Sequence, residues 1–63
     1  MDTQVRKLLL GKLRQPIHIS YIANYILKED ITKTKVIIDI LIEEDVIEES
    51  KYAKEYYVIK NKN

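Results

Sequence analysis

The chain contains no cysteine and only one histidine, His18, so neither disulfides nor a structural zinc site can hold its fold together. A domain of 63 residues buries only about 60% of the surface that its unfolded chain exposes. Two routes to stability remain, very apolar packing and self-association. The composition suits both, because 46% of the residues are hydrophobic and eleven of them are isoleucine.

The hydropathy pattern predicts neither a membrane protein nor a second domain. No uninterrupted apolar run approaches the ~20 residues that a transmembrane helix needs, and the N-terminus lacks the basic-then-apolar order of a signal peptide. We expect one soluble domain over residues 1–63, with residues 60–63 as a frayed tail and no membrane partner. The lack of cysteine fits a reducing compartment such as the cytoplasm.

The net charge is only +1, but the charged residues are unevenly distributed. Residues 6–14 contain four basic side chains, residues 43–49 contain five acidic ones, and residues 51–63 contain four lysines and one glutamate. This distribution predicts a dipolar molecule, although the net charge by itself argues little for nucleic-acid binding. The alternative is that the charges simply keep the helix surfaces solvated.

The spacing of the apolar residues predicts three helices followed by a β-hairpin. Leucine and valine recur at helical spacing between residues 5 and 13, and Pro16 disfavours helical backbone in the residue before it. After a short extended segment at 16–19, Ser20 is a suitable N-cap for the second helix and Thr32 for the third. The β-rich runs VIEES and EYYVIK follow, separated by the four-residue loop KYAK.

This order of elements resembles the winged helix-turn-helix family over residues 3–60. The resemblance is carried by ISYIANYILKEDITKTKVIIDILIEEDVIEES and by KYAKEYYVIK after it. The family's second motif helix ends in leucine, three polar residues, glycine and two apolar residues. Here Asp45 stands in the glycine position, and aspartate tolerates a positive φ better than most residues do. The resemblance implies a mostly α fold of three helices plus a small β-hairpin, the wing.

A helical projection divides residues 32–44 into two faces, at about 100° per residue. The inner face gathers Thr34, Ile37, Ile38, Leu41 and, just beyond the helix, Asp45. The outer side carries Val36 and Ile40, with Lys33 beside them. We therefore expect the inner face to pack against the domain and the outer face to meet solvent or a partner.

The resemblance implies that this helix is a recognition helix, whose first turns enter the major groove of duplex DNA. Lysines there can reach phosphates or a guanine edge, an apolar side chain can contact a thymine methyl, and the helix N-terminus suits a phosphate. The wing at 50–55 would follow the adjacent backbone or minor groove. We expect a sequence-specific, double-stranded DNA-binding transcriptional regulator. The expected contacts are Thr32, Lys33, Lys35, Val36, Lys51, Tyr52 and Lys54.

Two further kinds of contact are open. The branched aliphatic pair Val36 and Ile40 also fits a surface that binds a partner protein, which would make the chain a protein-interaction module with a winged-helix fold. The first helix predicts a homodimer, because its apolar residues cover more of its circumference than a one-sided helix needs. The expected dimer interface is Val5, Leu8, Leu9 and Leu10.

Catalysis, cofactor binding and metal binding find little support in the sequence. A single glycine excludes a glycine-rich phosphate loop, and His18 has no second ligand of matching type. A free-standing domain of this size looks similar to regulators of viruses and mobile elements, which would act in the host cell's cytoplasm.

The five tyrosines divide by position. Tyr57 alternates with Ile59 and is expected in the core, whereas Tyr21 and Tyr25 lie on the outer side of the second helix. Stacking of single-stranded bases on the tyrosines is a further conceivable role. The pattern argues against it, because the tyrosines do not interleave with basic residues on one strand face.

Overall fold

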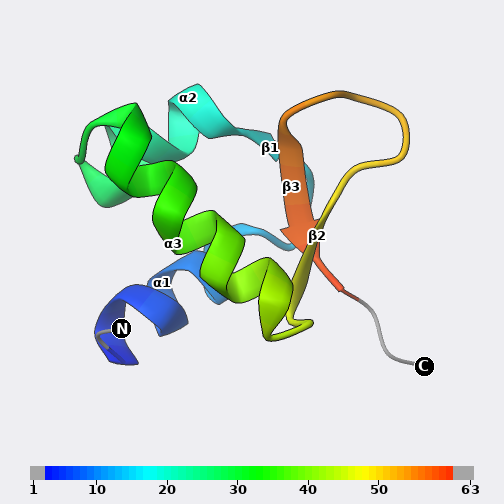
Figure 1. Ribbon diagram of the computed structural model, residues 1–63, viewed down its shortest axis with the longest axis horizontal. Coiled ribbons are helices and arrows are strands. Elements are labelled where there is room, and N and C mark those ends of the chain that lie inside the picture. The colour runs from blue at the N-terminus through cyan, green and yellow to red at the C-terminus, as the bar shows by residue number, and fades with distance from the viewer. Residues whose placement is uncertain (1–2, 61–63) are drawn as a thin grey trace.

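The computed structural model describes residues 3–60, in which helices pack to one side of a small antiparallel sheet (Figure 1). The elements in chain order are α1 (Thr3–Lys12), β1 (Ile17–His18), α2 (Ile19–Tyr21), the π-helical η1 (Ile22–Leu27), α3 (Ile31–Glu43), β2 (Ile47–Glu49) and β3 (Tyr56–Ile59). Strand β3 lies in the middle of the sheet, between β1 and β2. The expected class, mainly helix with a small β part, is confirmed, and β1 adds a third strand to the hairpin.

The first helix ends near the predicted place. After Lys12, the N–H of Leu13 still donates to the carbonyl of Leu9 (2.9 Å), and the chain then turns toward Pro16. The side chains of Leu9 and Leu13 are fully buried. The carbonyl of Leu13 accepts a hydrogen bond from the N–H of Ile59 (2.8 Å), so the turn after α1 is tied to the end of β3.

The second helical segment differs from its prediction in its N-cap and in its winding. The expected cap, Ser20, lies inside α2, and the Nδ1 atom of His18 accepts a hydrogen bond from the Ser20 N–H instead (3.1 Å). Helix α2 runs directly into η1, which ends at Lys28 with a left-handed φ of 56°. The N–H groups of Lys28 and Glu29 both donate to the carbonyl of Ala23 and close the helix end. The sequence did not indicate π winding, because an apolar period over six residues does not distinguish it from α winding.

Helix α3 also begins with a different cap. The predicted cap, Thr32, lies within the first turn, and its side chain is exposed. The carboxylate of Asp30 accepts a hydrogen bond from the N–H of Lys33 (2.7 Å), which makes Asp30 the N-cap. The prediction of Thr32 as the cap is therefore wrong by two residues.

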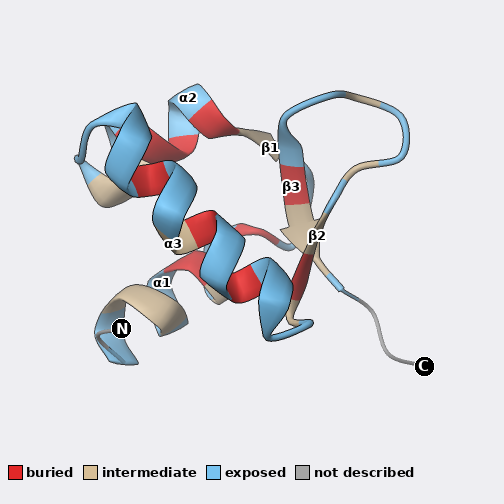
Figure 2. Cartoon of the chain, in the orientation of Figure 1, coloured by how far each residue is buried: buried red, intermediate tan, exposed pale blue. Residues whose placement is uncertain are grey.

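The predicted rotation of α3 is confirmed for the helix itself, but Asp45, expected on the inner face, is exposed. Its inner side forms the band of buried residues in Figure 2, where Thr34, Ile38 and Leu41 are fully buried. The outer residues Val36 and Ile40 remain 55% and 40% exposed. The helical period indicated this result, because Thr34, Ile37, Ile38 and Leu41 recur three and four residues apart on one side of α3, whereas the outer side has only Val36 and Ile40.

The turn after α3 carries the predicted positive φ. Asp45 has a φ of 66°, and the N–H of Val46 then donates to the carbonyl of Leu41 (3.2 Å). Lys60 closes this corner: its N–H donates to the carbonyl of Val46 (2.9 Å), and its ammonium pairs with Asp45. The hydrogen bond to the Asp45 carboxylate raises the pKa of Lys60. Lys60, the first residue of the expected tail, thus has a backbone hydrogen bond and an ion pair, and residues 61–63 lie outside the described residues.

The hairpin register brings the C-terminal strand into the core. Ile47 pairs with Ile59 across β2 and β3, and Ile17 pairs with Tyr57 across β1 and β3. Tyr57 is buried, as expected. The connection between β2 and β3 comprises the six residues 50–55, two more than the predicted loop. The core consists of Leu9, Leu13, Ile19, Ile22, Ile38, Leu41, Ile47 and Tyr57.

Thr34 gives a stability prediction. Its hydroxyl is fully buried and has no hydrogen-bond partner among the described residues. Thr34→Val replaces this hydroxyl with a methyl group of similar size, so we expect the free energy of unfolding to rise by about 1–2 kcal/mol. Urea denaturation followed by circular dichroism measures the change. Thr32→Val is the matched exposed control, expected within about 0.5 kcal/mol of wild type. A destabilised Thr34→Val would contradict the expectation.

Tyr57 gives a pH prediction. Burial raises the pKa of Tyr57 above its ordinary 10.0, opposed by the nearby Lys35 and reinforced by Glu49 and Glu55. A raised folded-state pKa contributes stability that is fully present below pH 10.0 and is lost as the pH rises toward the folded value. Above pH 10.0, the free energy of unfolding should therefore fall as Tyr57 ionises, and we expect that of Tyr57→Phe to fall less steeply. Tyr52→Phe is the control, and an equal decline in all three proteins would contradict the prediction.

Candidate functional site

The outer face of α3 is the first part of the candidate site. In Figure 1, α3 crosses the middle of the view, and Figure 2 shows exposed residues along its near side. The side chains of Thr32, Lys33 and Val36 are all exposed on its first two turns. This surface is available to a partner, as the projection of the sequence predicted.

The lysine at the start of α3 lies beside two carboxylates, those of Glu29 and Asp30. The ammonium of Lys33 lies 3.7 Å from the carboxylate of Glu29, in an exposed pair that contributes little stability. The carboxylate of Asp30 occupies the N–H of Lys33. The helix N-terminus therefore already holds an anionic group, and a phosphate there would meet like charge.

Lys35 is exposed on α3 and acts electrostatically on Tyr57 of β3. Its charge acts on the hydroxyl of Tyr57, and so do the charges of Asp39, Glu49 and Glu55. One lysine and three carboxylates therefore act on the same hydroxyl. This mixture makes Lys35 a weaker phosphate contact than an isolated lysine would be.

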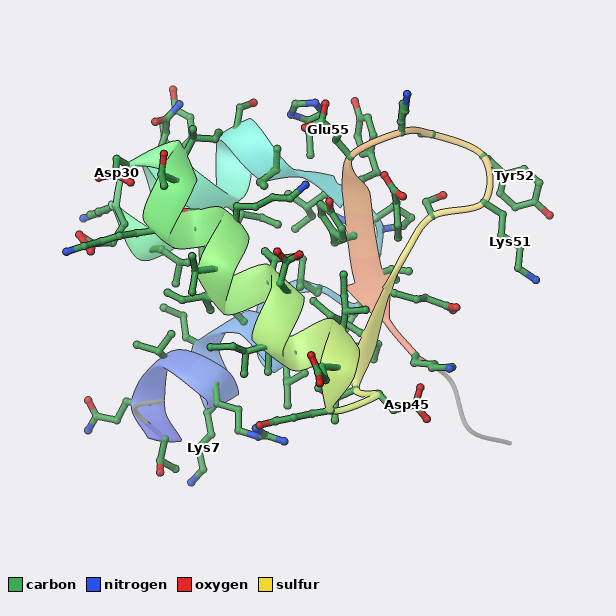
Figure 3. The ribbon with its side chains drawn as sticks, viewed as in Figure 1. Lys7, Asp30, Asp45, Lys51, Tyr52 and Glu55 are labelled. Atoms are coloured by element: carbon green, nitrogen blue, oxygen red, sulfur yellow. The ribbon has the colours of Figure 1, made fainter. Side chains whose placement is uncertain are left out.

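The β2–β3 loop, residues 50–55, is the second part of the candidate site. Its base is fixed by hydrogen bonds from the N–H of Ser50 to the carbonyl of Tyr56 (2.6 Å) and from the N–H of Glu55 to the carboxylate of Glu49 (2.6 Å). Its tip points away from the body, with Lys51 and Tyr52 outermost (Figure 3). Tyr52 is 96% exposed. Neither Lys51 nor Lys54 forms an ion pair within residues 3–60.

The predicted contact residues do not form one cluster. Asp30, at the start of α3, and Lys51, at the loop tip, lie at opposite sides of the view in Figure 3. The longest dimension of the molecule is 31 Å. A single ligand that touches both parts must therefore be extended.

The expected dimer interface on α1 needs one correction. Leu9 is fully buried in the chain's own core, so its side chain cannot reach a second copy. Val5 and Leu10 are half-buried against the same core, and Leu8 is 42% exposed. Leu8 is thus the main apolar contribution of α1 to the surface. The helical spacing did not reveal this, because the side of α1 that meets the core depends on its tertiary packing.

A group of aromatic residues was missed by the sequence reasoning. Rings from β1, α2, η1 and β3 line a surface hollow of about 510 Å³. The spacing of Tyr21 and Tyr25 predicts that they share a helix face, but only strand pairing places His18 beside Tyr56. The lining is Lys12, Gln15, Pro16, Ile17, His18, Tyr21, Tyr25, Ile26 and Tyr56.

Comparison of the chain with models of protein families, with curated proteins and with solved structures finds no match. Within residues 3–60, no helix has both the length and the apolar character needed to cross a bilayer. The same residues contain no group of three or more potential metal ligands.

The cap of α3 gives a prediction for this site. Asp30→Ala removes the acceptor for the Lys33 N–H, so we expect the free energy of unfolding to fall by about 1 kcal/mol. Asp30→Asn keeps a capping oxygen while it removes the charge, and should remain close to wild type. Urea denaturation of the three proteins tests this. Equal losses in both variants would mean that charge, not capping, matters at Asp30.

Proposed function

We propose that the chain is a small winged helix-turn-helix domain that binds duplex DNA as a sequence-specific transcriptional regulator. The order of helices and strands supports this, together with the antiparallel sheet in which β3 lies between β1 and β2. The observation that carries the proposal is the open outer face of α3, together with a projecting loop whose two lysines form no ion pair within residues 3–60. In this reading, α3 is the recognition helix and residues 50–55 are the wing.

The contacts follow from the exposed side chains. The first two turns of α3 would enter the major groove, where Val36 offers an apolar contact for a thymine methyl and Lys33 a charge for phosphate or guanine. Lys51 and Lys54 would bind the adjacent backbone, with Tyr52 at the tip. Carboxylates around Lys35 and at the end of α3 would repel phosphates, so only a few positions on this surface suit a phosphate. We therefore propose a modest electrostatic contribution to the affinity.

The salt dependence of DNA binding tests this proposal. With Lys33, Lys51 and Lys54 as the phosphate contacts, the logarithm of the association constant should fall with the logarithm of salt concentration with a slope of about −3. Fluorescence anisotropy with duplex DNA between about 50 and 200 mM salt measures the slope. Lys51→Gln should make it shallower by about one unit.

Lys7→Gln is the matched control, because Lys7 is an exposed lysine on α1, outside both parts of the proposed interface (Figure 3). It should leave the slope at the wild-type value. Binding no tighter than that of an unrelated neutral protein would reject the proposal, and equal effects of Lys51→Gln and Lys7→Gln would reject the wing as the contact.

A second candidate function rests on the exposure of Val36 and Ile40. Two branched aliphatic residues on one helix face are unusual for a surface that meets only DNA, and they fit a partner protein. If α3 binds a protein or its own copy, Ile40→Asp should abolish the complex in light scattering. Unchanged DNA affinity in the same variant would separate the two functions.

The homodimer through α1 remains a prediction, now with Leu8 as its centre and the half-buried Val5 and Leu10 beside it. A dimer would present two copies of α3 to a two-fold operator. Light scattering of wild type and Leu8→Asp at tens of micromolar tests this, and a monomeric wild type would contradict it.

A further inference from the structure

The hollow described above has an unusual lining. Four of its nine lining residues are aromatic, and they come from four elements that converge only in the folded chain. Its volume of about 510 Å³ lies within the range of sites that bind small molecules, about 300–1,000 Å³. No residue of α3 or of the 50–55 loop lines it. The hollow is therefore a separate surface from the proposed duplex interface.

The aromatic rings are held in two pairs. The rings of Tyr21 and Tyr25 are 4.8 Å apart and tilted by 37°, and those of His18 and Tyr56 are 5.1 Å apart, edge to face. Tyr25 is nonetheless 68% exposed. Each pair restrains its members, so a flat ligand would meet ring faces that need little reordering.

The hydrogen bonds of His18 indicate which of its two ring nitrogens carries the proton in the neutral form. The Nδ1 atom accepts from the N–H of Ser20 (3.1 Å) and lies 2.9 Å from the Ser20 hydroxyl. Because Nδ1 serves as the acceptor, the neutral ring carries its proton on Nε2. His18 therefore contributes a second ring nitrogen that donates a hydrogen bond, which suits a carbonyl or phosphate oxygen.

The charged residues that line the hollow indicate whether it suits a cationic or an anionic ligand. Lys12 is its only lysine or arginine, no carboxylate lines it, and Lys12 forms no ion pair within residues 3–60. An aromatic cage for a cation would place the guest beside this ammonium without a compensating acid. An anionic ligand with a flat ring satisfies both the aromatic faces and Lys12.

We propose that this hollow binds a nucleobase together with its phosphate, with the base stacked on Tyr21 and Tyr25 and the phosphate near Lys12. Aromatic faces combined with a positive charge are how proteins bind single-stranded nucleic acid without reading its sequence. A free nucleotide and a base in a single strand share this chemistry. The aromatic lining also resembles grooves for proline-rich peptides, but proline side chains give Lys12 no negative charge.

Two titrations of the full chain test the proposal. In the first, heteronuclear NMR follows His18, Tyr21 and Tyr25 while AMP or adenosine is added to about 5 mM, which detects millimolar dissociation constants. We expect both ligands to shift these signals, with AMP binding more tightly because of its phosphate. Lys12→Gln should remove the preference for AMP over adenosine.

In the second titration, fluorescence anisotropy measures binding of a labelled single-stranded oligothymidylate of about twelve nucleotides. Tyr25→Ala should weaken this binding about ten-fold, the usual effect of losing one stacked base. Tyr52→Ala removes an exposed tyrosine outside the hollow and is the matched control, expected at wild-type affinity. Tight binding of the oligonucleotide with no response to AMP assigns the site to single strands. A response to AMP with no binding of the oligonucleotide assigns it to free nucleotides.

Several outcomes would overturn the proposal: no response to either probe, equal oligonucleotide affinity in Tyr25→Ala and wild type, or a proline-rich peptide that alone shifts the hollow's signals. The result is independent of the proposed duplex binding. Lys51→Gln should weaken binding of duplex DNA but leave the AMP titration unchanged, and Tyr25→Ala should do the opposite. Failure of one function therefore leaves the other measurable.

Discussion

The burial of one side of α3 is the constraint on which the other surfaces depend. Ile38 and Leu41 are fully buried in the core cluster that also holds Leu9 and Ile47, so the helix has a single possible rotation. That rotation turns Val36 outward. In a chain without disulfides, loss of this packing would remove the outer face and the sheet together.

Strand β3 is the second organising feature, because it joins parts of the chain that are far apart in sequence. Its pairing with β1 places Tyr56 beside His18, and its pairing with β2 fixes the base of the 50–55 loop. The same strand therefore builds one wall of the aromatic hollow and supports the projecting loop. Because Tyr57 of β3 is buried in the hydrophobic core, both surfaces rest on the same core.

The two surfaces differ in chemistry. The outer face of α3 mixes lysines with carboxylates, so recognition there must rely on shape and on a few placed contacts more than on net charge. The hollow combines aromatic rings with one lysine and no carboxylate. This lining favours a flat anionic ligand, although the net charge of the whole chain is only +1. A molecule of this size has room for both proposed surfaces, because each needs only a few side chains on a shared core.

The sequence by itself determined the helix rotation and the burial of Tyr57, because each follows from a local period. The positive φ at Asp45 was implied by the resemblance, and aspartate tolerates that conformation. The cap of α3 is local, because Asp30 lies three residues before Lys33 and aspartate is a stronger N-cap than threonine. Tertiary structure decided the π winding of η1 and the burial of Leu9. It also decided the aromatic hollow, because the pairing of residues 17–18 with 56–57 depends on how distant segments meet in the core, and no local pattern specifies that meeting.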